Sequence, residues 1–322
     1  MPDRSDRSER SDPDGPAEPA SAVPDPVARP EPGPRPVSET LEAEIRAEMA
    51  AEIDEGEEVL PADADGDDEG DEEPASVDEL GLPMPVLEVA DALALLRDGE
   101  LELVGRLWAS TNNAMLCVAR HGSLEAACIY KPVMGERPLG DFPDYTLARR
   151  EVAAFAVSRA TGWEIVPPTV LREGPFGEGM VQLWIKADAA VEPVALVVNE
   201  DPRLRRMAAF DAAVNNTDRK AGHLIPVPGG HVYGVDHGVT FSPVPKLRTV
   251  LWAWRGLPFS EEETAVLREL RRGLDESLGT ALRELLDPIE VAATTRRIDR
   301  LLEAGVFPQP DPRWPALPWP PV

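Results

Sequence analysis

The sequence predicts an α+β domain in which the strands come first and most of the helices follow. Apolar residues alternate along several short segments between residues 101 and 186, which is the pattern of half-buried strands. From residue 202 onward the pattern is mainly helical, with one hairpin inside it. Strands and helices that are segregated along the chain in this way are typical of an α+β fold rather than a doubly wound parallel sheet.

The first 80 residues differ in composition from the rest of the chain. They contain 27 Asp and Glu against 6 Arg, a net charge of −21, and no aromatic residue precedes Trp108. Such a segment cannot bury enough apolar surface to offset the entropy lost on ordering. We therefore predict a disordered, acidic, proline-rich arm over residues 1–85. Within it, the spacing of apolar residues over 38–53 fits either a helix that docks on a partner or a transient helix without one.

The folded part is predicted to begin with a short helix over 89–96 and an antiparallel meander. Its three strands cover residues 101–107, 114–119 and 125–131, and a polar turn over 108–113 joins the first two. A helix over 146–162 follows, because its apolar positions fall on one face. Two further strands are expected at 169–171 and 180–186.

The second half is predicted to be helical around one hairpin. A helix over 204–213 precedes strands at 223–227 and 231–235, which close on a Pro-Gly-Gly turn at 228–230. We divide the folded domain, 86–308, into a sheet-rich part over 86–186 and a helical part over 187–308. The tail, 309–322, contains two tryptophans and six prolines, and we expect it to pack along the helical part.

The chain has only two cysteines, Cys117 and Cys128, and its charged start lacks the apolar run of a secretory signal. These features predict a cytoplasmic protein with reduced thiols in its core. No stretch of about 18 apolar residues occurs, so no transmembrane segment is expected.

Two acidic residues flank the predicted hairpin. Asp218 lies in the loop before it and Asp236, beside Gly238, lies at its far end. Phosphoryl transfer needs such an arrangement, because one carboxylate orients the attacking hydroxyl and the other holds the metal that bridges the phosphates. The alternative is a turn cap and an unrelated carboxylate at a strand end.

Residues 216–219 (Asn-Thr-Asp-Arg) resemble the catalytic loop of type II phosphatidylinositol 4-kinases, and residues 166–170 (Val-Pro-Pro-Thr-Val) resemble the start of a strand in the same enzymes. The region from about 100 to 305 is similar to an actinobacterial branch of the phosphatidylinositol 3-/4-kinase-like family. That family shares its two-lobed fold with protein kinases and HipA-type kinases. The resemblance implies a kinase that uses ATP with Mg²⁺ or Mn²⁺.

By position, the resemblance makes Asp218 the catalytic acid/base and Asp236 the metal ligand. It places Lys131 at the α and β phosphates, Glu151 as the ion-pair partner of Lys131, and Lys220 at the transferred phosphate. Only four of the 32 basic residues are lysines, and two of them, Lys131 and Lys220, fall where a compact charge is needed at phosphate. The alternatives are a snorkelling lysine at the sheet edge for Lys131 and a solvated surface charge for Glu151.

Two features depart from the family pattern. His223 stands where the family has an Asn as second metal ligand, which implies one metal, manganese, or a role of His223 at the substrate. The turn over 108–113 lacks the glycines of a protein-kinase phosphate loop, and no Walker motif occurs in the sequence. Ser110 and Thr111 either contact phosphate there or belong to an ordinary hairpin turn.

The predicted function is therefore ATP-dependent phosphoryl transfer to a lipid head group, a protein or a small polar molecule. The acidic arm disfavours both nucleic acid and a constitutive lipid substrate, since both are anionic. The arm could instead dock a basic partner or mimic a substrate. The alternative is a pseudokinase that acts by nucleotide binding or interaction. A metal phosphohydrolase is disfavoured, because Asp236 and His237 are adjacent on a strand and point to opposite faces.

Overall fold

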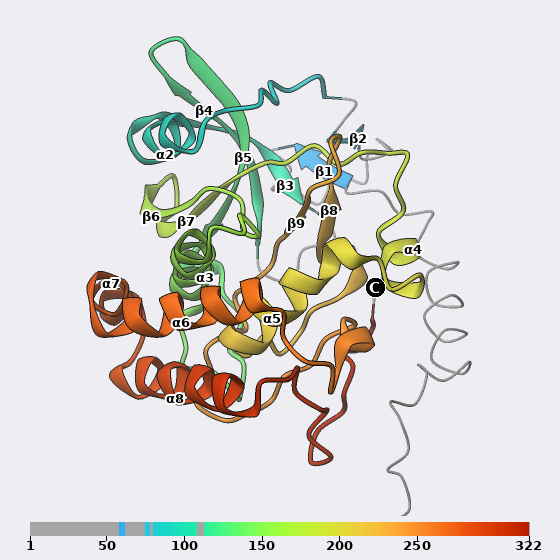
Figure 1. Ribbon diagram of the computed structural model, residues 1–322. Helices are drawn as coiled ribbons and strands as arrows, with labels where there is room; N and C mark the ends of the chain where they lie inside the picture. Colours follow the sequence, from blue (N-terminus) through green and yellow to red (C-terminus); the bar gives the residue numbers. More distant parts are fainter. Residues whose placement is uncertain (1–57, 62–74, 78–79, 108–112, 322) are drawn as a thin grey trace, which may run out of the picture. The chain divides into compact units, whose positions relative to one another are not determined.

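The computed structural model describes residues 58–61, 75–77, 80–107 and 113–321. Within these residues the fold is α+β, as the sequence predicts, with an antiparallel sheet followed by a mainly helical region (Figure 1). The predicted helix over 38–53, and Ser110 and Thr111 in the turn after the first predicted strand, lie outside the described residues.

The main sheet has the strand order β2-β1-β3-β4-β5-β7-β6, and every neighbouring pair is antiparallel. The three-stranded meander at its centre matches the predicted strands to within a few residues. The strands are β1 (Glu58–Pro61), β2 (Ala75–Ser76), β3 (Glu100–Leu107), β4 (Met115–His121), β5 (Leu124–Pro132), β6 (Thr169–Gly174) and β7 (Gly177–Leu183).

Strands β1 and β2 fall inside the range for which we predict a disordered arm. β1 pairs with the end of β3, with Val59 opposite Leu107 and Pro61 opposite Gly105. The backbone of β3 offers an edge of unpaired N–H and C=O groups there, and a neighbouring segment can satisfy them whatever its side chains. Two short segments within the predicted arm, Glu58–Pro61 and Ala75–Ser76, are therefore strands in the structure.

The helices are α2 and α3 around the sheet and α4 to α8 in the second half. Helix α3 contacts strands β6 and β7 as well as helices α6 and α7, so it lies between the sheet and the helical region (Figure 1). The bounds are α2 (Val89–Asp98), α3 (Leu147–Thr161), α4 (Pro193–Val198), α5 (Arg205–Val214), α6 (Glu261–Asp275), α7 (Ser277–Leu285) and α8 (Pro288–Ala304).

Short elements join the helices of the second half. A two-stranded sheet, β8 (Leu224–Pro226) and β9 (Val232–Gly234), occupies the place of the predicted hairpin. Single 3₁₀ turns are η1 (Val133–Gly135), η2 (Pro202–Leu204), η3 (Ala221–His223) and η4 (Trp252–Trp254). The hairpin separates the two acidic residues that the sequence singles out.

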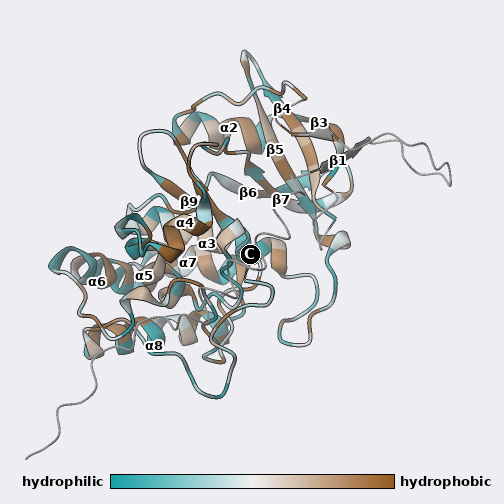
Figure 2. Cartoon of the chain, turned by 90° about the vertical axis from the view of Figure 1, so that its right-hand side faces the viewer, coloured by the Kyte–Doolittle hydropathy of each residue, from teal (hydrophilic) through white to brown (hydrophobic). Residues whose placement is uncertain are grey.

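Buried apolar residues form two large clusters. One lies between α2 and the sheet and includes Leu95, Cys128 and Val181. The other joins α3 to the later helices and includes Phe210 and Leu270. Helix α6 shows how the sequence produces this packing, because it carries both hydrophilic and hydrophobic residues (Figure 2) and buries only one face in the cluster.

The tail after α8 runs back across the helical region. Its backbone carbonyls at Ala316 and Pro321 accept hydrogen bonds from Thr249 N (3.2 Å) and Ala221 N (2.9 Å). Cys117 and Cys128 face each other on β4 and β5 as free, buried thiols, and burial raises the pKa of Cys117 to about 12. No helix among the described residues is long and apolar enough to span a bilayer.

Candidate functional site

Lys131, near the end of β5, is held between two carboxylates. Its Nζ lies 3.0 Å from Glu151 Oε1 and 3.1 Å from Asp236 Oδ1. Burial acts to lower the pKa of Lys131, but the charges of Asp236 and Glu151 outweigh it and raise the pKa above its usual value. The side chain is therefore a fixed cation at the junction of the sheet and the helical region.

Glu151 reaches Lys131 from α3 and also holds the backbone beside Asp236. Its side chain is 2% exposed, and its second oxygen, Oε2, accepts a 2.8 Å hydrogen bond from the backbone N–H of His237. Burial raises the pKa of Glu151, whereas the charge of Lys131 and the N–H of His237 act to lower it. Glu151 thus fixes Lys131 directly, and it fixes Asp236 through the backbone of the next residue, His237.

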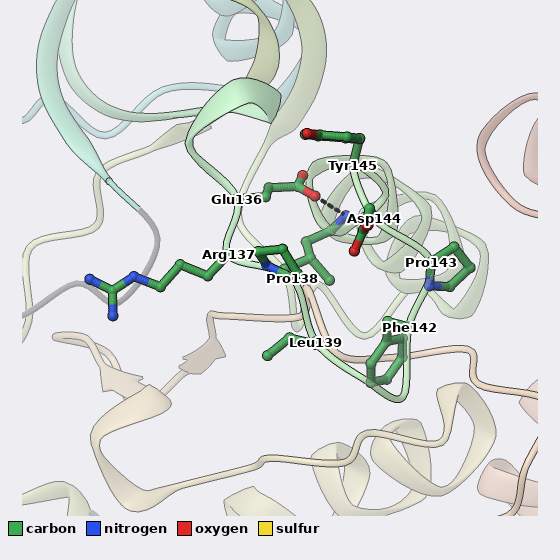
Figure 3. A pocket seen from close by; sticks show the side chains of 9 residues that line it. Glu136, Arg137, Pro138, Leu139, Phe142, Pro143, Asp144 and Tyr145 are labelled. Carbon is green, nitrogen blue, oxygen red and sulfur yellow. Dashed lines mark hydrogen bonds between the residues drawn. The ribbon is translucent and has the colours of Figure 1, made fainter.

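The start of α3 is anchored by a carboxylate from the loop that precedes it. Glu136 accepts hydrogen bonds from the backbone N–H groups of Leu147 (3.0 Å) and Ala148 (2.7 Å). Figure 3 shows Glu136 among the loop residues that line a small cavity. Because free N–H groups at a helix start favour negative charge, the contact stabilises α3 where it begins, one turn before Glu151.

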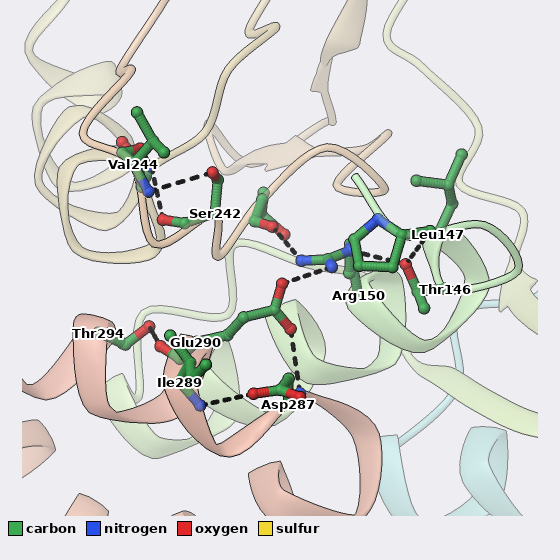
Figure 4. Close-up of polar contacts among 12 residues, drawn as sticks. Thr146, Leu147, Arg150, Ser242, Val244, Asp287, Ile289, Glu290 and Thr294 are labelled. Carbon is green, nitrogen blue, oxygen red and sulfur yellow. Dashed lines mark hydrogen bonds and ion pairs between the residues drawn. The ribbon is translucent and has the colours of Figure 1, made fainter. Parts of the chain in front are cut away.

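A second anchor on α3 is the side chain next to Glu151. Arg150 is fully buried and donates to Glu290 Oε1 on α8 (2.6 Å; Figure 4) and to Thr240 O (2.8 Å). Its guanidinium also lies over the Phe142 ring, 4.8 Å from the ring centre. Successive residues of α3 therefore point to two different partners, Glu151 to Lys131 and Arg150 to α8. The orientation of Glu151 is coupled to the helical core.

Asp236 follows β9 in a left-handed backbone conformation, with φ 58°. Such a conformation costs energy in a residue other than glycine and persists only where neighbouring contacts impose it. Here Arg219 Nη1 donates to Val235 O on one side (2.9 Å), and Glu151 accepts from His237 N on the other (2.8 Å). The carboxylate is half-exposed, and the charge of Lys131 holds its pKa well below the usual value, so it is ionised at neutral pH.

Asp218 lies in the loop between α5 and η3. The loop begins at Asn215, whose left-handed conformation (φ 55°) ends α5. It is shaped further by the bond from Asp218 N to Asn216 Oδ1 (3.0 Å). Burial raises the pKa of Asp218 from its usual 3.8 to about 6, and the charge of Lys220 acts in the opposite direction. A carboxyl with this pKa can accept a proton near neutral pH.

Arg219 is the residue of this site to which the sequence analysis assigns no role. Its guanidinium is fully buried and makes two bonds with Asp211 of α5, Nε–Oδ2 at 2.9 Å and Nη2–Oδ1 at 3.0 Å. It also donates to Val235 O and lies 2.6 Å from His237 Nε2. Arg219 therefore ties the loop of Asp218 to the segment of Asp236. The available signal was Asp211, a carboxylate within the otherwise apolar run of residues 207–214.

The two histidines have different surroundings. His223 Nε2 lies 3.5 Å from Asp236 Oδ2, and burial lowers the pKa of His223 to about 4, so the ring is neutral above pH 5. His237 is fully buried, faces Arg219, and is also neutral, because burial lowers its pKa well below the usual value. Asp236 and His237 thus turn to different partners, and they do not form a shared metal site.

Asp236 and His223 are the two predicted metal ligands, and they lie side by side. In the described ranges, no group of three or more His, Cys, Asp or Glu side chains is placed to hold a metal. Asp236 and the neutral His223 supply at most two ligands. Mg²⁺ is commonly bound in this way, by one or two carboxylates together with substrate phosphates and water.

An open groove of about 560 Å³ lies away from these residues, between the starts of α5 and α6 and the turn of the β8–β9 hairpin. None of the predicted site residues lines it. Its three arginines are already paired with carboxylates: Arg203 with Asp201, Arg205 with Glu263, and Arg206 with Glu262.

Comparison with known proteins gives one clear sequence relative. The chain is 39% identical over 275 residues to Protein Rv2133c of Mycobacterium tuberculosis. The alignment covers 74% of this chain and 98% of that protein. No protein-family model matches the sequence. Among solved structures, the proinflammatory kinase CtkA of Helicobacter pylori aligns with a TM-score of 0.42 and 10% identity, over 66% of this chain and 94% of that one. A likeness of this size does not by itself establish a relationship.

Proposed function

The chain belongs to the family of Protein Rv2133c of Mycobacterium tuberculosis, and we propose that it is an ATP-dependent phosphotransferase with a kinase-like architecture. The observation that carries this proposal is the cluster of Lys131, Glu151 and Asp236. A strand, a helix and a loop each contribute one residue, and a half-exposed carboxylate lies next to a fixed cation.

In this proposal Lys131 holds the α and β phosphates of ATP, and Glu151 keeps Lys131 in place. If the ion pair of Lys131 with Asp236 opens when nucleotide binds, the carboxylate of Asp236 would be free to hold a metal ion. A bound Mg²⁺ or Mn²⁺ would neutralise charge on the phosphates. The low pKa of Asp236 supports this role, because the ligand must be ionised at neutral pH.

Asp218 is the proposed acid/base. Its pKa of about 6 suits a group that takes a proton from an attacking hydroxyl at neutral pH. Lys220 is close enough for its charge to affect that pKa, which supports a place near the transferred phosphate. The contacts of Arg219 with Asp211, Val235 and His237 support a fixed spacing between Asp218 and Asp236.

The architecture adds support for a two-lobed, kinase-like division at about residue 186. An antiparallel sheet precedes the helices of the second half, and the apolar cluster between α2 and the sheet is distinct from the cluster of the helical region, to which α3 also contributes. The resemblance of residues 216–219 to the phosphatidylinositol 4-kinase loop points the same way. The acceptor is a lipid head group, a protein or a small polar molecule, and the strongly acidic arm favours the last two over an anionic bilayer surface.

A pseudokinase is the second candidate, and one observation favours it. His223 occupies the position of the second metal ligand and lies beside Asp236, at 3.5 Å. A neutral imidazole is a poor ligand for Mg²⁺, which prefers oxygen. A pseudokinase would bind the nucleotide weakly or without a metal ion and would transfer no phosphate.

The test compares two substitutions in the full chain. Asp236→Asn should abolish metal-dependent ATP binding, measured by calorimetry. Asp218→Asn should keep that binding but lower transfer of the γ-phosphate, followed with labelled ATP, by about 10²- to 10⁴-fold. Asp144→Asn, at an exposed loop carboxylate, is the matched control and should change neither. Full transfer by the Asp218→Asn chain would defeat the assigned mechanism, and ATP binding without transfer in the wild type would favour the pseudokinase.

A further inference from the structure

The loop that carries Asp218 is paired along its backbone with a distant segment, residues 248–250. Arg248 N donates to Asn216 O (3.0 Å), Arg219 N donates to Arg248 O (3.1 Å), and Val250 N donates to Arg219 O (3.1 Å). Arg219 and Thr249 form a parallel bridge. The residues on both sides of Asp218 are therefore held by this segment.

The C-terminal tail in turn holds that segment. Thr249 N donates to Ala316 O (3.2 Å), and the guanidinium of Arg248 donates to Leu317 O through Nε (3.3 Å) and Nη2 (3.2 Å). Trp252 Nε1 also donates to Ala316 O, at 3.0 Å. These bonds join two stretches of chain that are about 65 residues apart.

Pro321, the last described residue of the tail, makes a direct hydrogen bond to the loop of Asp218. Ala221 N, three residues after Asp218, donates to Pro321 O at 2.9 Å. The end of the chain thus lies beside the segment that leads into β8 (Figure 1). The tail therefore contacts the loop of Asp218 in two ways. It binds Ala221 directly, and it binds residues 248–250, which in turn pair with Asn216 and Arg219.

The tail is well suited to hold a fixed position. Lys246 Nζ lies 4.9 Å from the centre of the Trp314 ring, and Pro318 and Pro321 are buried. Proline loses less conformational entropy on ordering than other residues, so a proline-rich tail docks at a lower entropic cost. The carbonyl groups of Ala316 and Pro321 are therefore held in place as acceptors for Thr249 N and Ala221 N.

We propose that residues 314–321 are a positioning element of the phosphotransfer site, which fixes the loop of Asp218 through residues 248–250 and Ala221. This inference rests on the proposed function for its effect on catalysis, but the contacts do not depend on it. The hydrogen bonds of the Lys131 and Glu151 side chains go to each other, to Asp236 and to the backbone of His237. The proposed role of the tail therefore concerns the transfer step rather than nucleotide binding.

The charge of Arg248 adds a second consequence. It acts to lower the pKa of Asp218, against the effect of burial. Because Leu317 O accepts two bonds from that guanidinium, the tail also keeps a cation near the proposed acid/base. Loosening the tail should therefore affect both the position and the surroundings of Asp218.

The experiment loosens the tail within the full chain by the double substitution Pro318→Gly and Pro321→Gly. Its matched control is Pro310→Gly with Pro312→Gly, just outside the element. Hydrogen exchange should become about tenfold faster at the amides of Arg219, Ala221 and Thr249, and stay unchanged at Lys131 and Glu151. The kcat for γ-phosphate transfer should fall about tenfold or more, while the KM for ATP stays within about twofold. The control chain should match the wild type.

Unchanged exchange at the three amides, or an unchanged kcat in a wild type that transfers phosphate, would overturn the proposal. If the wild type transfers no phosphate, the proposed function fails, and the amide exchange alone still decides whether the tail holds the loop. Arg248→Lys is the second variant, should the double substitution unfold the chain. Lysine keeps the charge but loses the forked donor, so it should also lower kcat and leave the KM for ATP unchanged. A wild-type kcat in Arg248→Lys would count against the proposal.

Discussion

Lys131 and Asp236 are 105 residues apart in the sequence and are joined by an ion pair of 3.1 Å between Nζ and Oδ1. The lysine comes from the main sheet, and the aspartate follows the small hairpin within the helical region. Both remain partly accessible, with side chains 20% and 46% exposed. A ligand can therefore reach this pair and exchange places with one of its partners, which is what the proposed function requires.

Lys131→Met should destabilise the chain as well as remove nucleotide binding. Glu151 would lose its counter-ion while its side chain is only 2% exposed, at a cost of about 1–3 kcal/mol at pH 7. Burial would then raise the pKa of Glu151 further, so the loss should shrink as the pH falls and the group becomes neutral. Urea unfolding at pH 7 and pH 5 measures both effects. Equal stability of variant and wild type at pH 7 would contradict the buried ion pair.

Arg150→Met tests the anchor of α3. It leaves Glu290 and Thr240 O without their buried donor, and we expect a loss of about 3–5 kcal/mol in the free energy of unfolding. The neighbouring Arg149 offers a matched control, because its pair with Glu178 is partly exposed. Arg149→Met should cost no more than about 1 kcal/mol. Similar losses for the two variants would mean that Arg150 does not anchor the helix.

Arg219 and Asp211 form a pair with no exposed side-chain surface at either partner. Arg219→Met should cost about 3–5 kcal/mol, because it leaves a buried carboxylate uncompensated. Adding Asp211→Leu should restore part of that loss, with a coupling energy of about 1–3 kcal/mol in a double-mutant cycle. Chemical denaturation of the four chains supplies the data, and simple additivity would argue against a direct pair.

The raised pKa of Asp218 predicts how both activity and stability depend on pH. Transfer requires the ionised carboxylate, so its rate should rise with pH and reach half its maximum near pH 6. Because the folded chain has the higher pKa, it binds more protons than the unfolded chain between about pH 4 and pH 6. Stability from this group is therefore present at low pH and is lost as the pH rises through that window.

Asp218→Asn removes this dependence. The variant should have a higher thermal midpoint than the wild type at pH 7, and the difference should shrink below about pH 4, where Asp218 is neutral in both states. Thermal melts at a series of pH values test this. A wild type that is more stable than the variant at pH 7 would mean that burial does not penalise the ionised form of Asp218.

Much of the fold could be predicted from the spacing of apolar residues along short segments of the sequence. The alternation along β3 to β5 and the presence of a helix at α3 are properties of consecutive residues, so the sequence predicts them. The buried side of α3 differs from the predicted apolar face, because Arg150 and Glu151 are buried and Ala160 is exposed. The β1 strand was missed because its pairing with β3 is made by backbone groups, which an acidic composition does not reveal. The pairing of Lys131 with Glu151 was expected from the family resemblance, which places Glu151 on the helix that follows the strand of Lys131.

The buried charges of the site could not be found in this way. Arg150 and its partner Glu290 are 140 residues apart, and an arginine between Arg149 and Glu151 in a helix is expected at the surface. Arg219 was visible within the motif, but its burial depends on Asp211, Val235 and His237 meeting around it. Such contacts arise only when the chain is folded, because they join segments that share no local pattern.

The most direct test of the central claim is the thermal midpoint of the full chain with ATP and either Mg²⁺ or Mn²⁺, for the wild type and Asp236→Asn. A ligand that binds only the folded state stabilises it by about 2.7 kcal/mol at a hundred times its Kd, which corresponds to roughly 5–10 °C for a domain of this size. The account predicts a metal-dependent rise of this order in the wild type and none in the variant. No rise with either metal, or an equal rise in both chains, would contradict it.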